Sequence, residues 1–226
     1  MNKVQKGDFI ELEYTASIKE NNLVFDTTNE EIAKRHNIYH KEHKYNPVVV
    51  CIGEEIVVKG LDKDLEGKEI GKEYLVELVP EEAYGKKDPK LYQLVSAAKF
   101  KSQDMMPMPG LQVTVDNLMG VIKTVSGGRV MIDFNHPLAG KNINYAYKIV
   151  KVIENDEEKL KAFSTMYLPE AETSLKENTA LIKLKQSIPN EIQEMIKEKL
   201  QKSIPSIKNV EFEVKDNKTI EKVATT

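Results

Sequence analysis

Residues 47–71 have the sequence PVVVCIGEEIVVKGLDKDLEGKEIG, in which five glycine or proline residues divide short apolar runs. It starts with the apolar run VVVCI, turns at Gly53 and continues through Val57-Val58-Lys59-Gly60-Leu61. Apolar runs bounded this closely by glycine and proline are typical of a strand followed by a very short helix that lies across a sheet. We therefore expect the apolar side of this helix to carry a shallow apolar pocket.

The segments on either side of this stretch have the pattern of strands. Residues 8–18, DFIELEYTASI, alternate as a strand with one buried face, and Asn21-Asn22 turns the chain into a second strand that ends at Asp26. Pattern alone leaves Asp26 either as a cap for Thr27-Thr28 or as a functional carboxylate. Residues 73–79 form another strand, which leads into a loop that carries Tyr84.

Composition narrows the classes of partner. The net charge of −3 and the pI near 5.9 give no global field for nucleic acid or an anionic membrane, so we expect neither as a partner. The single cysteine, Cys51, lies in an apolar run and is interpreted as a buried small hydrophobe rather than a nucleophile. With no apolar leader segment and no long apolar run, we expect a soluble, cytoplasmic protein.

Three histidines are the only pattern that suggests a metal. His36 and His40 are four residues apart and His43 follows, but no cysteine or supporting aspartate joins them. Solvated histidines on a surface loop are therefore favoured, and we expect no metal site.

Several landmarks together resemble one family. They are Tyr14, Phe25-Asp26, Gly53 with residues 57–61, the Gly67 to Gly71 turn and Ala83-Tyr84-Gly85. Their order and approximate spacing resemble the FKBP-type peptidyl-prolyl cis-trans isomerases. The resemblance implies an α+β fold, in which an antiparallel half-barrel sheet, here residues 1–86 plus 138–154, wraps a short helix.

The chain departs from that family after the Tyr84 loop. A last strand follows only at residues 142–150, so residues 87–137 are interpreted as an insertion. Period-two runs at 111–115, 121–125 and 130–134, with turns at 117–120 and 126–128, predict a small all-β domain. An insert at this place, followed by residues 135–140 (NHPLAG), is similar to the SlyD-type branch, which combines isomerase and chaperone behaviour.

Three methionines cluster in the insert. Met105, Met106 and Met108 lie among prolines, and flexible thioether side chains suit a surface that accepts many apolar shapes. We predict a chaperone site for unfolded peptide here; the alternative is that these side chains fill the core of the insert.

Residues 155–226 follow a charged break at 154–158 and predict a separate α+β domain. Helices are expected near 159–166 and 189–201, and strands near 179–185 and 210–215. The apolar faces are modest, so this domain is expected to lean on the main domain or on a second copy in a homodimer. It lacks the His- and Cys-rich tail common in SlyD-type proteins, which removes any basis for predicting nickel or zinc.

The resemblance also implies a site. Tyr14, Asp26 and Tyr84 would be catalytic, with Asp26 orienting Tyr14, and the pocket would be lined by Phe25, Val57, Val58, Leu61 and Tyr145. Leu61 stands where many members have tryptophan, so we expect a permissive pocket. The predicted function is isomerisation of X-Pro bonds in unfolded polypeptides, with no cofactor; the alternatives are a holdase chaperone and a docking adaptor with a vestigial pocket.

Overall fold

The computed structural model describes residues 3–101 and 104–214. The described residues divide into two compact units: residues 3–16, 24–76 and 145–214 form the first, and residues 17–23, 77–101 and 104–144 form the second.

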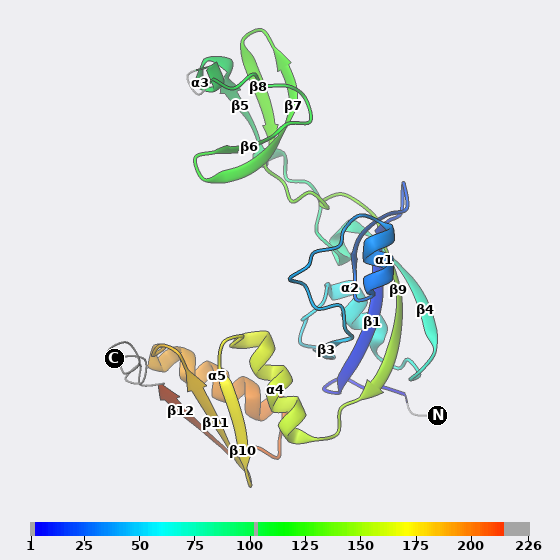
Figure 1. Cartoon of the computed structure of the whole chain (residues 1–226), viewed down its shortest axis with the longest axis vertical. Helices are drawn as coiled ribbons and strands as arrows, with labels where there is room; N and C mark the ends of the chain where they lie inside the picture. The colour runs from blue at the N-terminus through cyan, green and yellow to red at the C-terminus, as the bar shows by residue number, and fades with distance from the viewer. Residues whose placement is uncertain (1–2, 102–103, 215–226) are drawn as a thin grey trace, which may run out of the picture. The chain divides into compact units, whose positions relative to one another are not determined.

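A five-stranded sheet forms the main part of the first unit (Figure 1). Its strands are β1 (Phe9–Ile18), β2 (Leu23–Thr27), β3 (Val48–Cys51), β4 (Glu73–Leu78) and β9 (Ile143–Val152). The order is β2-β1-β9-β4, and β3 pairs antiparallel with β1. Two short helices, α1 (Glu30–Arg35) and α2 (Lys59–Leu65), accompany the sheet, and α2 confirms the helix predicted in residues 47–71.

Strand alternation builds the core against α2. Leu12, Ala16 and Ile18 of β1 are buried, as are four alternate residues of β9, Ile143, Tyr145, Tyr147 and Ile149. Leu61 and Leu65 of α2 are completely buried, and the Tyr147 hydroxyl donates a 2.6 Å hydrogen bond to the Asp64 carboxylate of that helix. Because Tyr145 and Tyr147 are two residues apart on one strand, both point to the α2 face of the sheet.

The C-terminal part of the first unit is α+β, as predicted. It consists of α4 (Asp156–Tyr167), β10 (Glu172–Lys176), β11 (Thr179–Leu184), α5 (Asn190–Ser203) and β12 (Asn209–Val214). Strand β11 lies between an antiparallel β10 and a parallel β12. The prediction missed β10 and placed the start of the first helix too late.

The charged residues of the predicted break coincide with the start of helix α4, whose N-cap is Asn155. The Asn155 side chain accepts hydrogen bonds from the backbone N–H groups of Glu157 and Glu158, and three acidic residues occupy the first turn. Acidic side chains at a helix N-terminus are stabilised by the helix dipole, so the charge favours the helix. Of the two supports predicted for this region, contact with the main domain is confirmed, because Phe9 and Cys51 share its core.

The second unit contains its own antiparallel sheet (Figure 1). Its strands are β5 (Tyr92–Ser96), β6 (Gln112–Val115), β7 (Leu118–Ser126) and β8 (Arg129–Asp133), in the order β5-β8-β7-β6. A short helix, α3 (Ala97–Lys101), follows β5, and single 3-10 turns span Pro80–Glu82 (η1) and Pro89–Leu91 (η2). The sequence interpretation missed β5 and α3. Phe100, Val113, Val115, Ile122, Val130 and Ile132 form the core.

One predicted turn in this sheet is wrong. The turn expected at 117–120 is centred on Asp116 and Asn117, with φ of 50° and 65°, while Gly120 lies inside β7. A Cβ at Gly120 would approach the Ile132 side chain to 2.6 Å. The glycine therefore provides space for close packing and does not mark a turn.

Candidate active site

Three neighbouring strands bring Asp26, Tyr14 and Tyr145 together. The Tyr14 hydroxyl on β1 donates a 2.7 Å hydrogen bond to Oδ2 of Asp26 on β2. The Tyr14 and Tyr145 rings lie 5.7 Å apart between centroids, at an angle of 58°. Since β1 lies between β2 and β9, alternate residues of all three strands can meet on one face.

The second function considered for Asp26, capping, belongs to another residue. Asn29 is the N-cap of α1, and its side chain accepts from the Ile32 backbone N–H at 3.1 Å. The Asp26 carboxylate instead accepts from the Tyr14 hydroxyl.

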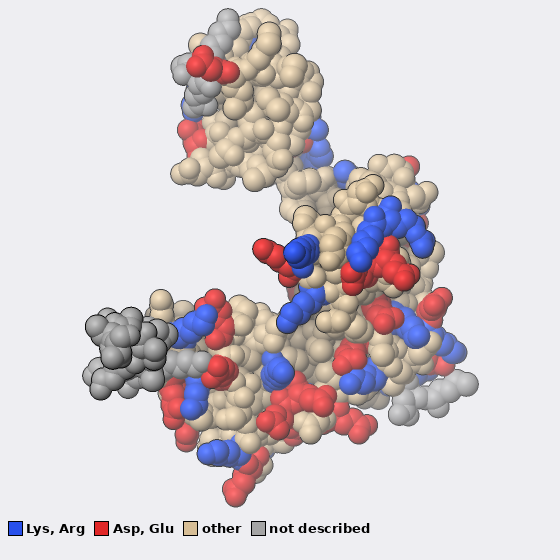
Figure 2. Space-filling view, viewed as in Figure 1, with Lys and Arg blue, Asp and Glu red and all other residues tan. Residues whose placement is uncertain are grey.

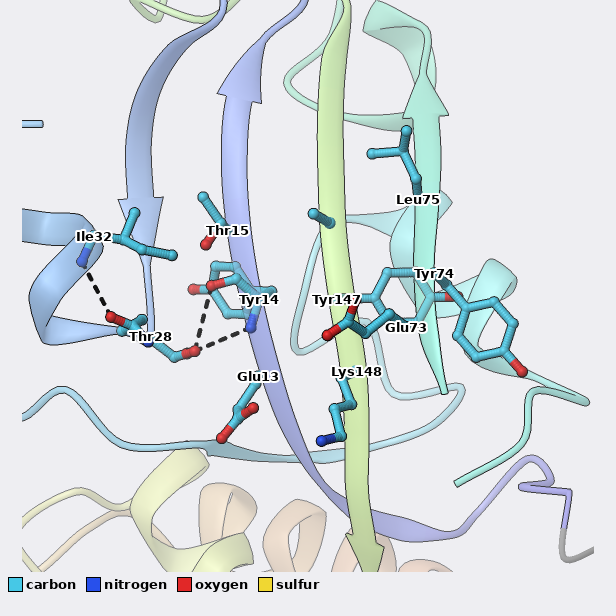
Figure 3. Close-up of a pocket in the computed structure, with 12 residues that line it drawn as sticks. Glu13, Tyr14, Thr15, Thr28, Ile32, Glu73, Tyr74, Leu75, Tyr147 and Lys148 are labelled. Atoms are coloured by element: carbon cyan, nitrogen blue, oxygen red, sulfur yellow. Dashed lines mark hydrogen bonds between the residues drawn. The ribbon is translucent and has the colours of Figure 1, made fainter. Parts of the chain in front are cut away.

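Two buried threonines, which the sequence interpretation did not assign to the site, hold the Tyr14 backbone. The Tyr14 N–H donates to Thr28 Oγ1 at 3.0 Å (Figure 3). The Thr28 N–H donates to the Tyr14 carbonyl, also at 3.0 Å. Thr27 Oγ1 also donates to that carbonyl and bonds the Thr15 hydroxyl. Their position directly after Asp26 was the available signal, and they fix the strand segment that presents the Tyr14 side chain.

The start of α2 supplies the predicted apolar residues. Val58 is the N-cap residue of this helix, and its carbonyl accepts from the Asp62 N–H at 3.0 Å. Val57 and Val58 are half-buried and Leu61 is completely buried. Phe25 is half-buried next to Asp26 on β2. All these residues belong to the first unit, in which Tyr14 contacts both Asp26 and Tyr145.

The predicted residue Tyr84 lies in the second unit, just after η1. Its ring stacks in parallel on His136, with 4.9 Å between centroids and 3° between planes. The Gly85 carbonyl accepts from the Gly140 N–H at 2.8 Å, and the Leu138 N–H donates to Nδ1 of His136 at 3.2 Å. His136 is thus a neighbour of Tyr84 to which the sequence interpretation gave no role.

A hollow of about 590 Å³ lies on the other face of the first unit's sheet (Figure 3). Its lining includes Tyr14, Tyr74 and Tyr147 together with Thr15 of β1, Lys148 of β9 and Leu75 of β4. Carboxylates and an ammonium group share its rim with Leu75. The hollow and the candidate active site thus have Tyr14 in common.

Met105, Met106 and Met108 are exposed on the insert, Met106 to 80%. The alternative was that these side chains fill the core of the insert, but they are not part of that core. The sequence interpretation missed three more exposed apolar residues, which lie on strands of the insert: Leu94 of β5, and Leu118 and Met119 of β7. Figure 2 shows few charged side chains on the visible face of this domain, which is drawn at the top.

Within residues 3–101 and 104–214, no group of three or more His, Cys, Asp or Glu side chains is arranged to hold a metal ion. Over the same residues, no helix is long and apolar enough to cross a membrane. Cys51 is buried, and this burial raises the pKa of its thiol to about 12, so it is not a nucleophile at neutral pH.

Comparison with known proteins identifies the family. A family model of the FKBP-type peptidyl-prolyl cis-trans isomerase matches residues 1–101. The short-type peptidyl-prolyl cis-trans isomerase of Methanocaldococcus jannaschii is 32% identical over 149 residues, which are 66% of this chain and 94% of the relative. The chain belongs to the FKBP-type peptidyl-prolyl cis-trans isomerase family.

Other relatives of this FKBP-type chain carry the same family description. A probable FKBP-type 16 kDa isomerase of Pseudomonas fluorescens is 31% identical over 111 residues, 47% of this chain and 73% of the relative. SlyD of Vibrio cholerae is 33% identical over 110 residues, 47% of this chain and 54% of the relative. A model described as the FKBP26 IF domain matches residues 93–138, in the insert.

Proposed function

We propose that this FKBP-type isomerase acts on X-Pro bonds of unfolded or partly folded polypeptides, and that its insert binds those polypeptides. In this proposal Tyr14, Asp26 and Tyr84 are the catalytic residues. The pocket is lined by Phe25, Val57, Val58, Leu61 and Tyr145. The domains of the proposal are the isomerase domain (1–86 and 138–154), the insert (87–137) and the C-terminal domain (155–226).

Cis-trans isomerisation of an X-Pro bond is a rotation in which no covalent bond breaks, so catalysis depends on the environment that surrounds the amide. Rotation about a peptide bond meets a barrier of ~18–20 kcal/mol, because resonance holds the amide planar. Water stabilises the charge-separated planar form, whereas a dry pocket favours the twisted one relative to it. The catalytic requirement is therefore an apolar surface with a few oriented polar groups.

The hydrogen bond between Tyr14 and Asp26 is the single observation that carries the site. It orients a carboxylate beside two aromatic rings on the buried face of the sheet. In the proposed complex this carboxylate opposes the dipole of the twisting carbonyl, and Val57 and Val58 contact the substrate proline. Leu61 is completely buried and has no exposed surface for such a contact. The Tyr84 hydroxyl and the Val58 N–H hold the carbonyls of the peptide and so fix its orientation.

The insert supports a chaperone role through its exposed apolar side chains. Met106 and Met108 are among the most exposed apolar residues that the structure describes. The insert has a hydrophobic core of its own, and neither side chain belongs to it. Exposed apolar side chains that lie together mark interaction surfaces, and methionine adapts to many shapes. Binding an unfolded chain here raises the local concentration of its prolines at the pocket.

Excision of the insert tests this role. The Asp88 N–H donates to Asn135 Oδ1 at 2.7 Å, and Nδ2 of Asn135 donates back to the Asp88 carbonyl at 3.1 Å, so the chain leaves and returns at neighbouring points. Residues 89–134 can be replaced by a short glycine linker. We expect proline-limited refolding of a protein to slow far more than turnover of a tetrapeptide.

Equal losses in the two assays would contradict capture by the insert. Met106→Ser with Met108→Ser is the matched test in the intact chain, and Thr114→Ser on the same domain is its control. A holdase with a vestigial pocket, the second candidate, would prevent aggregation but leave proline-limited refolding slow.

A homodimer through the C-terminal domain is part of the proposal. Met195 of α5 is 69% exposed and Ile192, three residues earlier, is also exposed, which places two apolar side chains on one helix face. Sedimentation of Met195→Lys against the unchanged chain tests it. We also propose a cytoplasmic location, which suits a chain whose single cysteine is a buried thiol.

A further inference from the structure

The C-terminal domain shares a hydrophobic core with the isomerase sheet. Phe9 of β1 and Cys51 of β3 are cross-strand partners, 1% and 3% exposed. They belong to one cluster with Leu160 and Phe163 of α4 and Leu200 of α5. The end of β3 is therefore packed directly against the C-terminal domain, and the segment that follows it leads to the pocket.

That segment, residues 53–58, is closed onto a single residue of α2. The Asp62 carboxylate is 5% exposed and accepts from the Gly53 N–H at 3.0 and 3.1 Å and from the Glu55 N–H at 3.3 Å. The Asp62 N–H in turn donates to the Val58 carbonyl at 3.0 Å. Asp62 thus ties both ends of the segment that carries Val57 and Val58.

The backbone of this segment depends on such ties. Gly53 and Glu55 have φ of 90° and 52°, and a residue with a side chain such as Glu55 is disfavoured in that left-handed region. Its conformation persists because the surrounding hydrogen bonds impose it.

A second tie comes from the C-terminal domain. Nζ of Lys199 on α5 lies 3.0 Å from Oε2 of Glu54, the residue between Gly53 and Glu55. The same ammonium group lies 4.4 Å from the centre of the Tyr167 ring of α4. The Tyr167 ring on one side and the Glu54 carboxylate on the other restrict the position of the Lys199 ammonium group, and this group in turn restrains the turn.

We propose that the C-terminal domain positions the isomerase pocket through residues 53–58, with Lys199 and Asp62 as positioning residues. Lys199 restrains the turn from outside through Glu54, and Asp62 restrains it from inside through its carboxylate. Both restraints act on the direction in which Val57 and Val58 leave the turn. The inference rests on the site proposed above, in which these two valines contact substrate.

The test compares Lys199→Met with Lys197→Met in the full chain. Lys197 is on the same helix and pairs with Glu194, so its removal makes the same change in charge away from Glu54. Hydrogen exchange of the amides of residues 53–58 and the separate values of kcat and KM for a tetrapeptide are measured. We expect Lys199→Met to raise both the exchange rates and KM about two- to five-fold, the range for a partly exposed ion pair. Lys197→Met and Lys199→Arg are expected to leave both near the parent values.

A double variant separates this mechanism from a general loss of stability. If Lys199 acts through Glu54, Lys199→Met with Glu54→Gln will be no worse than Lys199→Met alone. Asp62→Ala should raise exchange more than Lys199→Met does, and Asp62→Asn, which keeps one acceptor oxygen, should recover part of the loss.

Equal exchange and KM in the Lys199 and Lys197 variants would overturn the inference, as would additive effects in the double variant. Increased exchange with unchanged kcat and KM would also overturn it, because the turn would then move without affecting the pocket. Failure of the proposed site itself is a separate result, since it appears as unchanged turnover in Tyr14→Phe.

Discussion

Replacing Tyr14 with phenylalanine removes the hydroxyl that orients Asp26 and keeps the ring that faces Tyr145. The lost hydrogen bond is 2.7 Å long and joins a phenol to a carboxylate, both half-buried. Without this donor, the Asp26 carboxylate either binds water in place of the hydroxyl or rotates away from its position. Either change disturbs the dry, oriented environment that the reaction needs. The expected defect is in catalysis and not in the apolar contacts that bind the substrate.

The size of the defect follows from the type of hydrogen bond. Bonds to charged groups contribute about 1.5–3 kcal/mol net, and partial exposure favours the lower end, about 1.5 kcal/mol. Since 1.4 kcal/mol corresponds to a factor of ten, kcat/KM for a tetrapeptide should fall about ten-fold, with the loss mainly in kcat.

A double-mutant cycle with Asp26→Asn checks the reasoning. If the two side chains act as one unit, Tyr14→Phe with Asp26→Asn will be about as slow as either single variant. Tyr74→Phe is the matched control, because it also removes one hydroxyl from a tyrosine of the same sheet. The hydroxyl of Tyr74, on β4, accepts from the Glu69 N–H at 2.9 Å and does not contact Asp26. Unchanged turnover in Tyr14→Phe, or an equal loss in Tyr74→Phe, would refute the assignment.

Three further predictions concern packing, pH and the thiol. Gly120→Ala should destabilise the insert by about 1–3 kcal/mol through the clash with Ile132, measured by hydrogen exchange, while tetrapeptide turnover persists; normal exchange would contradict this. For Asp133, burial raises the carboxyl pKa, but hydrogen bonds from Lys87 and Asn135 outweigh burial and lower it from 3.8 to about 2. Its stabilisation is therefore present above about pH 4 and is lost as the pH falls towards 2, and melting of Asp133→Asn should lack that dependence. Burial raises the Cys51 pKa to about 12, so alkylation at pH 8 should be slow until the chain is unfolded; fast labelling of the native chain would contradict it.

The elements found from sequence are those with local signals. Strand β1 follows from the alternation of its residues, and helix α2 from the glycines and apolar pairs that bound it. Gly120 shows where such signals mislead, because the sequence alone does not distinguish a glycine that makes room for the Ile132 side chain from a glycine that forms a turn. Strand β10 was missed because ETSLK is short and weakly apolar.

The periodicity of the strands, the short helix after Gly53 and the order of landmarks that resembles the family can all be read from the amino-acid sequence. The folded chain supplies the hydrogen bond from Tyr14 to Asp26, a pair that the resemblance already implied. The capping of α1 by Asn29 and the contacts of Asp62 and Lys199 with the turn before Val57 are seen only in the folded chain. These contacts join residues on different strands and helices. Strand order and packing bring such residues together, and local patterns of apolar and polar residues do not specify which buried or charged side chains will meet.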